Sequence, residues 1–197
     1  MNTRLVTLRK LNDEQLEKLA GLHKEVVHSL LTDLGLPFLQ KYYRIARAEG
    51  TVIGFCALSE ADTPLGWAIG SPNPEKLNDK LKQPLSWFIF QILRVAIRDP
   101  RLLWQLLLSA RSASMEVEPV SVELTYLGVD SSARGIGLGR TLLEAFIQAS
   151  KGQYRAVVLS VEVENTNAIQ LYTTSGFQIV KTLNEGKFQR HHMKLKL

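Results

Sequence analysis

Hydrophobic residues recur at helical intervals in the first part of the chain. Asn12 is followed by Asp-Glu-Gln, the spacing of a capping box, and apolar positions then repeat every three or four residues up to Leu30. This pattern predicts a helix that begins after Asn12 and ends near Gly35, with a second short helix after Pro37.

The next segment has the pattern of β-strands. Residues 44–48 and 51–58 are two runs rich in strand-forming residues, and Glu49-Gly50 separates them. A glycine-containing turn between two such runs predicts a β-hairpin. Residues 65–69 predict one further strand.

The second half of the chain has a more regular order of elements. Residues 120–129 predict a strand, a glycine-rich loop follows, and the apolar residues after the loop repeat at four-residue steps, as in a helix. Residues 154–163 are almost continuously apolar and predict a buried strand. A short helix, a left-handed cap at Gly176 and a hairpin over 177–195 complete the order. We therefore expect one α/β domain over residues 1–197, with a mixed sheet and helices on its faces.

Composition narrows the class of protein. The chain has 197 residues, 45% of them hydrophobic and 22% charged, which is ordinary globular usage. The formal charge of +5 favours an anionic partner, but no polybasic run indicates nucleic acid. Cys56 is the single cysteine, which excludes an internal disulfide and fits a reducing compartment, so we expect a cytoplasmic protein. We expect no transmembrane segment and no secretory signal, because the apolar stretches are short and the first ten residues carry three charges.

The glycine-rich loop is the segment that indicates chemistry. Three glycines at alternating positions leave the backbone open to a ligand, and the first turn of the next helix has unpaired amides at the positive end of its dipole. Two arginines add charge on either side. The sequence thus predicts a pyrophosphate site formed by Arg134, Gly135, Ile136, Gly137, Leu138, Gly139 and Arg140.

Three other interpretations of this loop fit less well. A P-loop requires Lys followed by Ser or Thr, which Arg140-Thr141 does not supply. A dinucleotide-binding fingerprint needs a glycine at the position of Arg140 and a shorter distance between the strand and the first glycine. In its favour, Glu162 and Glu164 lie about where that fingerprint has its ribose-binding acid. The third alternative is a turn with a purely structural role.

Two blocks of the sequence carry a family resemblance. Residues 129–139, VDSSARGIGLG, and residues 165–177, NTNAIQLYTTSGF, resemble in order and separation the two signatures of the GCN5-related N-acetyltransferase (GNAT) superfamily. The second block fits the pattern N-x-x-A-x-x-L-Y-x-x-x-G-F. Residues 44–58, taken as a hairpin, are a weaker third match.

The resemblance implies an acetyl-CoA co-substrate held between two strands that splay apart in a V, here 120–129 and 154–163. The glycine loop would bind the pyrophosphate, and backbone amides of the first strand would run beside the pantetheine arm and stabilise the oxyanion of the thioester. The strand and helix residues that it assigns to the cofactor are Leu127, Gly128, Val129, Asn165 and Ala168. Gly128 departs from the family, which usually has a larger residue there, so the local bulge could differ.

The resemblance also implies two catalytic residues. Tyr172 matches the family tyrosine near the thioester sulfur and is assigned as general acid, with core packing as the alternative. Glu123 matches a strand carboxylate used as base in some members, and the alternative is a solvent-facing strand residue. Glu162 and Glu164 are the reserve bases.

The histidines have simpler interpretations. We expect His23 to be a hydrogen-bonded core residue, because it lies on the apolar stripe of the first helix. His191 and His192 are adjacent in a strand and face opposite ways, so no metal site is predicted.

A helical insertion of about residues 74–115 separates the first strands from the cofactor-binding strand. Pro84 and Pro100 are expected to divide it. Residues 82–115 hold five basic residues against one acid. The insertion could cover one face of the sheet, act as a substrate lid or homodimer contact, or lie on a membrane surface.

The resemblance predicts an N-acetyltransferase that moves an acetyl group from acetyl-CoA directly to a primary amine of a small molecule (amino sugar, amino acid or polyamine) or of a protein N-terminus. The alternative is a CoA-binding sensor or docking module without transferase activity.

Overall fold

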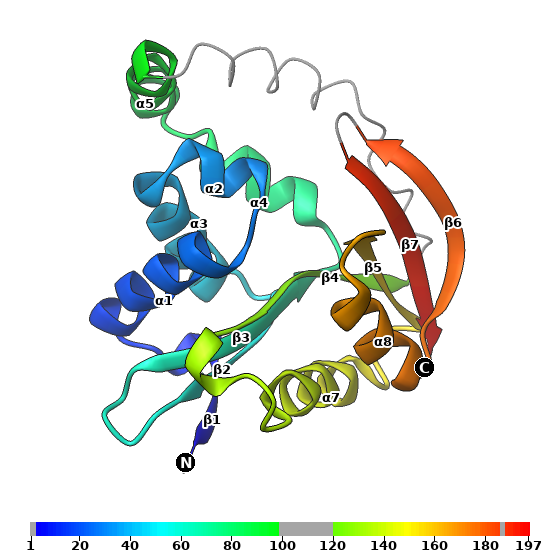
Figure 1. Ribbon diagram of the computed structural model, residues 1–197. Helices are drawn as coiled ribbons and strands as arrows, with labels where there is room; N and C mark the ends of the chain where they lie inside the picture. Colours follow the sequence, from blue (N-terminus) through cyan, green and yellow to red (C-terminus); the bar gives the residue numbers. More distant parts are fainter. Residues whose placement is uncertain (1–2, 99–119, 186–187) are drawn as a thin grey trace.

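The computed structural model describes residues 3–98, 120–185 and 188–197 (Figure 1). Its described strands form one seven-stranded sheet in the order β1-β2-β3-β4-β5-β7-β6. The β4–β5 pair is parallel and the other pairs are antiparallel. The strands are β1 (Arg4–Thr7), β2 (Ile53–Leu58), β3 (Pro64–Ser71), β4 (Ser121–Val129), β5 (Ala156–Glu162), β6 (Gln178–Glu185) and β7 (Phe188–Lys196). This is the mixed α/β sheet that the sequence predicts.

Helices cover both faces of the sheet (Figure 1). The helices of the first half pack on one face of β3 and β4, and those of the second half lie on the other. The α-helices are α1 (Asp13–Val26), α2 (Leu30–Leu34), α3 (Leu36–Ala48), α4 (Pro74–Leu81), α5 (Leu85–Arg98), α7 (Leu138–Ser150) and α8 (Thr166–Thr174). Two short 3-10 turns, η1 (Leu8–Lys10) and η2 (Ser131–Ala133), lie in connections.

The capping box at Asn12 is confirmed. Its side chain accepts from the Gln15 amide at 2.8 Å, and the Asn12 amide donates to Gln15 Oε1 at 3.0 Å. The helix ends at Val26, earlier than expected, because Ser29 caps the separate helix α2 by accepting from the Thr32 amide.

The predicted hairpin over residues 44–58 is wrong, although its second strand, 51–58, is present as β2. Residues 44–48 are the last turns of α3, whose buried side chains Phe38, Leu39, Tyr42, Tyr43 and Ala46 continue one helical stripe. The stripe packs on the sheet, and this burial outweighs the local strand preference. The hairpin in the structure joins β2 to β3. The predicted strand 65–69 lies within β3.

The structure confirms the break at Pro84, which separates α4 from α5. The break expected at Pro100 and the rest of the insertion lie outside the described residues. The closing hairpin of β6 and β7 and the left-handed Gly176 (φ +94°) are also as predicted.

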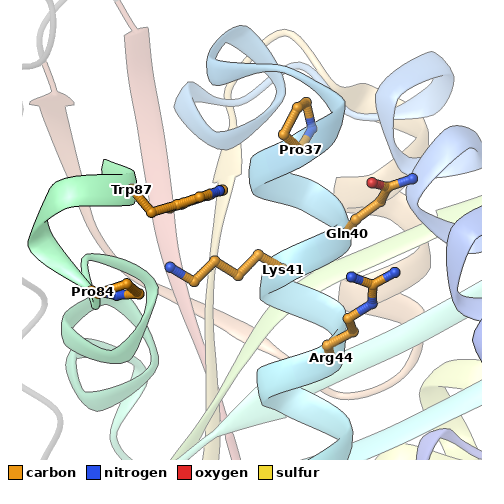
Figure 2. A pocket seen from close by; sticks show the side chains of 6 residues that line it. All are labelled: Pro37, Gln40, Lys41, Arg44, Pro84 and Trp87. Atoms are coloured by element: carbon orange, nitrogen blue, oxygen red, sulfur yellow. The ribbon is translucent and has the colours of Figure 1, made fainter. Parts of the chain in front are cut away.

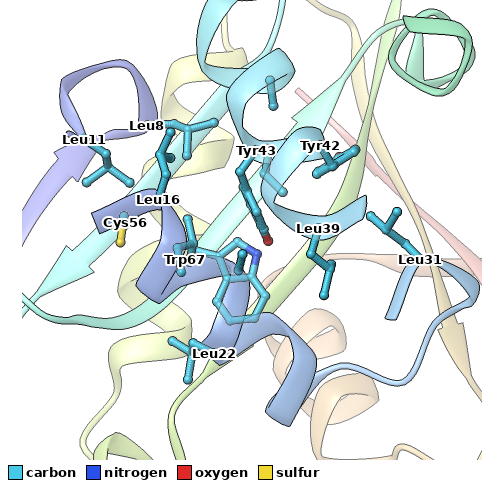
Figure 3. Packing of buried hydrophobic residues seen from close by; sticks show 14 of the residues in the cluster. Leu8, Leu11, Leu16, Leu22, Leu31, Leu39, Tyr42, Tyr43, Cys56 and Trp67 are labelled. Carbon is cyan, nitrogen blue, oxygen red and sulfur yellow. The ribbon is translucent and has the colours of Figure 1, made fainter. Parts of the chain in front are cut away.

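One core cluster lies between α1, α3 and the sheet (Figure 3). Trp67 and Tyr43 are fully buried in it, and Figure 3 shows the Tyr43 hydroxyl pointing toward the Trp67 indole nitrogen. His23 completes this group: its Nδ1 lies 2.7 Å from Tyr43 Oη and its ring stacks on Trp67 at 5.4 Å. His23 is therefore the buried, hydrogen-bonded core histidine that the sequence predicts, and burial lowers its pKa to about 4.

Candidate functional site

Strands β4 and β5 pair at their beginnings and then part. The register joins Ser121, Val122 and Glu123 to residues 156–158 and goes no further. Beyond this point β5 pairs along its length with β7, while β4 remains paired with β3. The edge of β4 from residue 124 onward is therefore not covered by β5, as the family resemblance implies.

A β-bulge lies where the strands part. Ile69 on β3 is opposite Tyr126, whereas Gly70 is opposite Leu124, so Thr125 is the extra residue. Bulges re-aim the side chains of a strand. After the bulge, Tyr126 packs with the α1–α3 core. Leu127 packs with the second core cluster, which lies between α7 and the sheet.

The backbone direction of β4 follows from one hydrogen bond. The Asp130 amide donates to Leu65 O on β3 at 2.8 Å. Because successive strand residues point to opposite edges, the amides of Val129 and Leu127 point away from β3, toward the edge that β5 leaves uncovered. Of the three residues expected beside the cofactor arm, Leu127 and Val129 thus present donors, and the Gly128 amide faces β3.

Gly128 itself has a steric explanation. A Cβ at this position would lie 2.5 Å from Trp67 Cη2. The bulge is at Thr125, three residues earlier, so the missing side chain at Gly128 accommodates the buried tryptophan and does not form the bulge.

The glycine loop follows β4 through the turn η2. Asp130 fixes the turn by accepting from the Ser132 amide at 2.8 Å, and Arg134 Nε donates to Val129 O at 3.3 Å. Gly135 (φ +79°) and Gly137 (φ +84°) then adopt left-handed backbone conformations that favour glycine. A Cβ at either position would meet nothing within 4 Å, so the protein leaves space there.

Helix α7 begins at the end of this loop without a side-chain cap. Gly137 is its N-cap residue, and the Thr141 amide is the first to bond within the helix, donating to Gly137 O at 3.1 Å. The amides of residues 138–140 belong to the unpaired first turn, at the positive end of the dipole. This arrangement suits a phosphate group.

The two arginines of the loop have different surroundings. Both are exposed, but Arg140 donates to Thr174 Oγ1 at 2.9 Å and so ties α7 to α8. Sequence reasoning did not predict this link, since the partner lies 34 residues away. Arg134 stays close to the loop backbone through Val129 O.

Helix α8 places the second motif beside the first. The Asn165 side chain caps the helix by accepting from the Ala168 amide at 3.2 Å. Tyr172 is 8% exposed and packs on Phe177, with ring centroids 5.7 Å apart. Burial raises the pKa of Tyr172 to about 12, so its hydroxyl stays protonated at neutral pH.

Glu123 lies on the face of β4 away from α7, at the last position of β4 that pairs with β5. Its side chain is half-buried, near two tyrosines: Tyr126 of β4 and Tyr42 of α3, whose rings are 5.7 Å apart. Burial is the main cause that raises the pKa of both phenols, and the Glu123 carboxylate adds to it. The Glu123 carboxylate therefore makes ionisation of the Tyr42 and Tyr126 phenols less favourable.

The reserve carboxylates differ from each other. Glu162 Oε1 lies 3.6 Å from Arg190 Nη2 on β7, across the β5–β7 pair. The Arg190 charge in turn lowers the pKa of Tyr126, against the larger effect of burial. Glu164 is exposed in the turn before α8.

Sequence reasoning therefore missed Tyr42, Tyr126 and Arg190, which the fold gathers near Glu123 from α3, β4 and β7. They are far apart in sequence and carry no local motif. Tyr42 Oη and Thr125 Oγ1 are both buried in this region, and Thr125 lowers the pKa of Tyr42 against the larger effect of burial.

Two further properties concern metals and membranes. The described ranges contain no group of three or more His, Cys, Asp or Glu side chains that could share a metal ion. In the same ranges, no helix has both the length and the apolar character needed to cross a bilayer.

The comparisons with known proteins agree with this geometry. Residues 101–177 match the model of the acetyltransferase (GNAT) family. The mycothiol acetyltransferase of Kineococcus radiotolerans is 41% identical over 68 residues, 34% of this chain and 22% of that protein. The enzyme of the same name from Jonesia denitrificans is 47% identical over 58 residues, 29% of this chain and 18% of that protein. The matched segments thus span about a fifth of the length of these curated relatives.

Solved structures share the fold over the whole chain. An Arabidopsis thaliana NAA60 in complex with a bisubstrate analogue superposes with a TM-score of 0.63 at 15% identity, covering 100% of this chain and 99% of that one. The putative acetyltransferase yncA from Salmonella typhimurium with acetyl-CoA gives 0.64 at 14% identity, covering 100% and 95%. The order of the strands, the parting of β4 from β5 and the glycine loop together correspond to an acyl-CoA N-acyltransferase fold. The family model thus matches residues 101–177, and the solved structures extend the likeness of fold over the length of the chain.

Proposed function

We propose that this protein is an acetyl-CoA-dependent N-acetyltransferase that transfers the acetyl group directly to a primary amine. One observation carries the proposal: the open glycine loop at the N-terminus of α7 adjoins the uncovered edge of β4. The family match over residues 101–177 supports the same activity.

The donor side consists of backbone groups. The amides at the start of α7, with Arg134 beside them, are suited to the diphosphate of CoA. The amides of Leu127 and Val129 are suited to the arm of the donor and to the oxyanion that develops on its carbonyl. Acetyl-CoA supplies the activated thioester acyl group. Asn165 and Ala168 border the donor from α8.

Tyr172 acts as the general acid in this proposal. When the amine attacks the carbonyl and the C–S bond breaks, the sulfur leaves with the electron pair and a negative charge. A phenol whose pKa is about 12 is protonated at that moment and donates its proton toward the sulfur.

Glu123 acts as the base, directly or through water. A lysine-like amine has a pKa of about 10.4 and arrives mostly as the ammonium, so it must lose one proton before attack and a second after it. Glu123 offers a carboxylate on the face of β4 away from α7, where Tyr42 and Tyr126 line its surroundings. Glu162 is the weaker candidate, because Arg190 lies next to it.

A covalent acetyl-cysteine intermediate is not part of this mechanism. Cys56 is fully buried on β2, and burial raises the pKa of its thiol to about 12. The thiolate is the nucleophilic form of cysteine, so this side chain is a poor acceptor of an acyl group.

The acceptor is a primary amine of a small molecule, such as an amino sugar, an amino acid or a polyamine, or of a protein N-terminus. Relatives named mycothiol acetyltransferases support the first group, and the NAA60 fold match with a bisubstrate analogue is compatible with the second.

The test is release of CoA thiol from acetyl-CoA across a panel of these amines. We expect at least one amine to be acetylated, and Tyr172→Phe to lower kcat on the order of a hundredfold with the Kd for CoA nearly unchanged. Tyr154→Phe, outside the site, is the matched control. Glu123→Gln is compared with Glu60→Gln in an exposed turn.

Two results would contradict the proposal. Unaltered kinetics of Tyr172→Phe would remove its role as acid. Silence with every amine, despite tight CoA binding, would favour a CoA-binding module without transferase activity.

A further inference from the structure

Helix α5 is apolar on two sides, and only one of them packs on the part of the protein that the structure describes. Its inner side contributes Trp87, Phe88 and Ile92 to the α1–α3 core. The rings of Trp87 and Phe88 lie 5.1 and 5.9 Å from that of Phe38 on α3. This side needs no other partner.

A polar contact fixes the orientation of α5 as well. Lys41 of α3 lies over the Trp87 ring, with Nζ 3.7 Å from the centroid, and donates to Leu81 O at 2.8 Å and to Gln83 O. Figure 2 shows this lysine between Trp87 and Pro84, in a pocket lined by Pro37, Gln40, Lys41, Arg44, Pro84 and Trp87. With its inner side held at this point, α5 turns the opposite side outward.

The outer side of α5 carries a continuous apolar stripe. Leu85, Ile89, Leu93 and Ile97 follow at four-residue steps, which spread over about 120° of the helix surface. Their exposed fractions are 64%, 48%, 56% and 84%, and Phe90 beside them is 56% exposed. These five make up nearly half of the eleven large hydrophobic side chains that are exposed in the described residues. We call them the outer face of α5.

The charges around the outer face have one sign. The only charged residues of α5 are Arg94 and Arg98, and the Arg94 guanidinium lies 5.6 Å from the Phe90 ring at the border of the stripe. Across residues 74–98 there are five basic residues and two acidic ones, a net charge of +3. An apolar stripe with a cationic border and no acid on its helix complements an anionic lipid surface.

Two physical points favour lipid over a second copy of the chain. A second copy would place Arg94 against a helix that carries no acidic residue to neutralise it, whereas anionic headgroups neutralise this charge. The 14 residues of α5 span about 21 Å, too short to cross a bilayer but suited to lie in its interface.

We propose that the outer face of α5 docks this protein on anionic membranes. The helix lies parallel to the surface, the stripe enters the boundary between headgroups and acyl chains, and Arg94 contacts the headgroups. Figure 1 shows α5 at a corner of the molecule, away from the sheet and from α7, so the glycine loop stays accessible to CoA in the docked protein.

The test is sedimentation of the full-length chain with vesicles that contain phosphatidylglycerol, or with vesicles of phosphatidylcholine alone, at low salt. We expect binding to the first, at least about tenfold weaker binding to the second, and release by high salt. The double variant Leu93→Asp/Ile97→Asp is expected to lose binding at least about tenfold.

The matched control is Val180→Asp, because Val180 is an exposed apolar residue (63%) on β6. It is expected to bind vesicles like the wild type. CoA binding measured on every variant shows that the fold is intact, and it separates failure of this proposal from failure of the proposed function.

Several outcomes would overturn the proposal. The first is wild-type protein that stays in the supernatant with phosphatidylglycerol vesicles. The second is equal binding of the wild type to the phosphatidylcholine and the phosphatidylglycerol vesicles. The third is a loss of vesicle binding by Val180→Asp as large as that of Leu93→Asp/Ile97→Asp. A dimer in solution that Leu93→Asp/Ile97→Asp dissociates would show that a second copy occupies the outer face instead.

Discussion

Lowering the pH from 7 to 5 should destabilise the protein through His23. The imidazole is fully buried among Tyr43, Trp67 and Tyr126, and burial lowers its pKa from 6.5 to about 4. In the unfolded chain the side chain regains its ordinary pKa.

The sign and size of the effect follow from proton linkage. Between pH 6.5 and 4 the unfolded state binds a proton that the folded state excludes, so stability is full above pH 6.5 and falls as the pH decreases through this window. One pKa unit corresponds to about 1.4 kcal/mol, so the loss is about 2 kcal/mol at pH 5 and about 3 kcal/mol at pH 4.

The assay is urea unfolding of the wild type, His23→Gln and His28→Gln at a series of pH values, followed by circular dichroism. His23→Gln removes the titrating group, so its stability relative to the wild type should rise by about 2 kcal/mol between pH 7 and 5. His28 is exposed, and His28→Gln should follow the wild type. A constant difference between the wild type and His23→Gln over this range would refute the reasoning.

Two more predictions concern the site. Gly128→Ala should lower the free energy of unfolding by about 1–3 kcal/mol, because the new Cβ would meet Trp67 at 2.5 Å, and a melting temperature equal to that of the wild type would contradict this. The pH profile of kcat should show no loss of activity from Tyr172 ionisation below pH 10, because the pKa of this phenol is about 12; a limb below pH 10 that Tyr172→Phe removes would contradict it.

The parts of the fold set by neighbouring residues could be predicted from the sequence. The capping box at Asn12, the glycine loop and the Asn165 cap each depend on contacts within a few positions, and the structure contains all three. The hairpin over 44–58 failed because tertiary burial decided the conformation of its first half.

The surroundings of Glu123, the proposed base, could not be predicted in the same way. Tyr42, Tyr126 and Arg190 come together near Glu123 only when α3, β4 and β7 take their places around the sheet. The Thr125 bulge, which decides the faces that the later β4 residues occupy, is visible only in the register of β3 and β4.

The glycine loop can be tested directly by calorimetric titration with CoA of the wild type, Gly139→Ala and Gly21→Ala. A Cβ at Gly139 would make only ordinary contacts with the protein, 3.6 Å from Val129 Cγ2 and 3.7 Å from Leu171 Cδ2, and a Cβ at Gly21 in α1 would meet nothing within 4 Å. Both variants should fold. If the loop binds the diphosphate of CoA, the wild type and Gly21→Ala bind with the same Kd, and Gly139→Ala binds at least about tenfold more weakly. No heat of binding to the wild type, or equal affinity of all three proteins, would contradict the account.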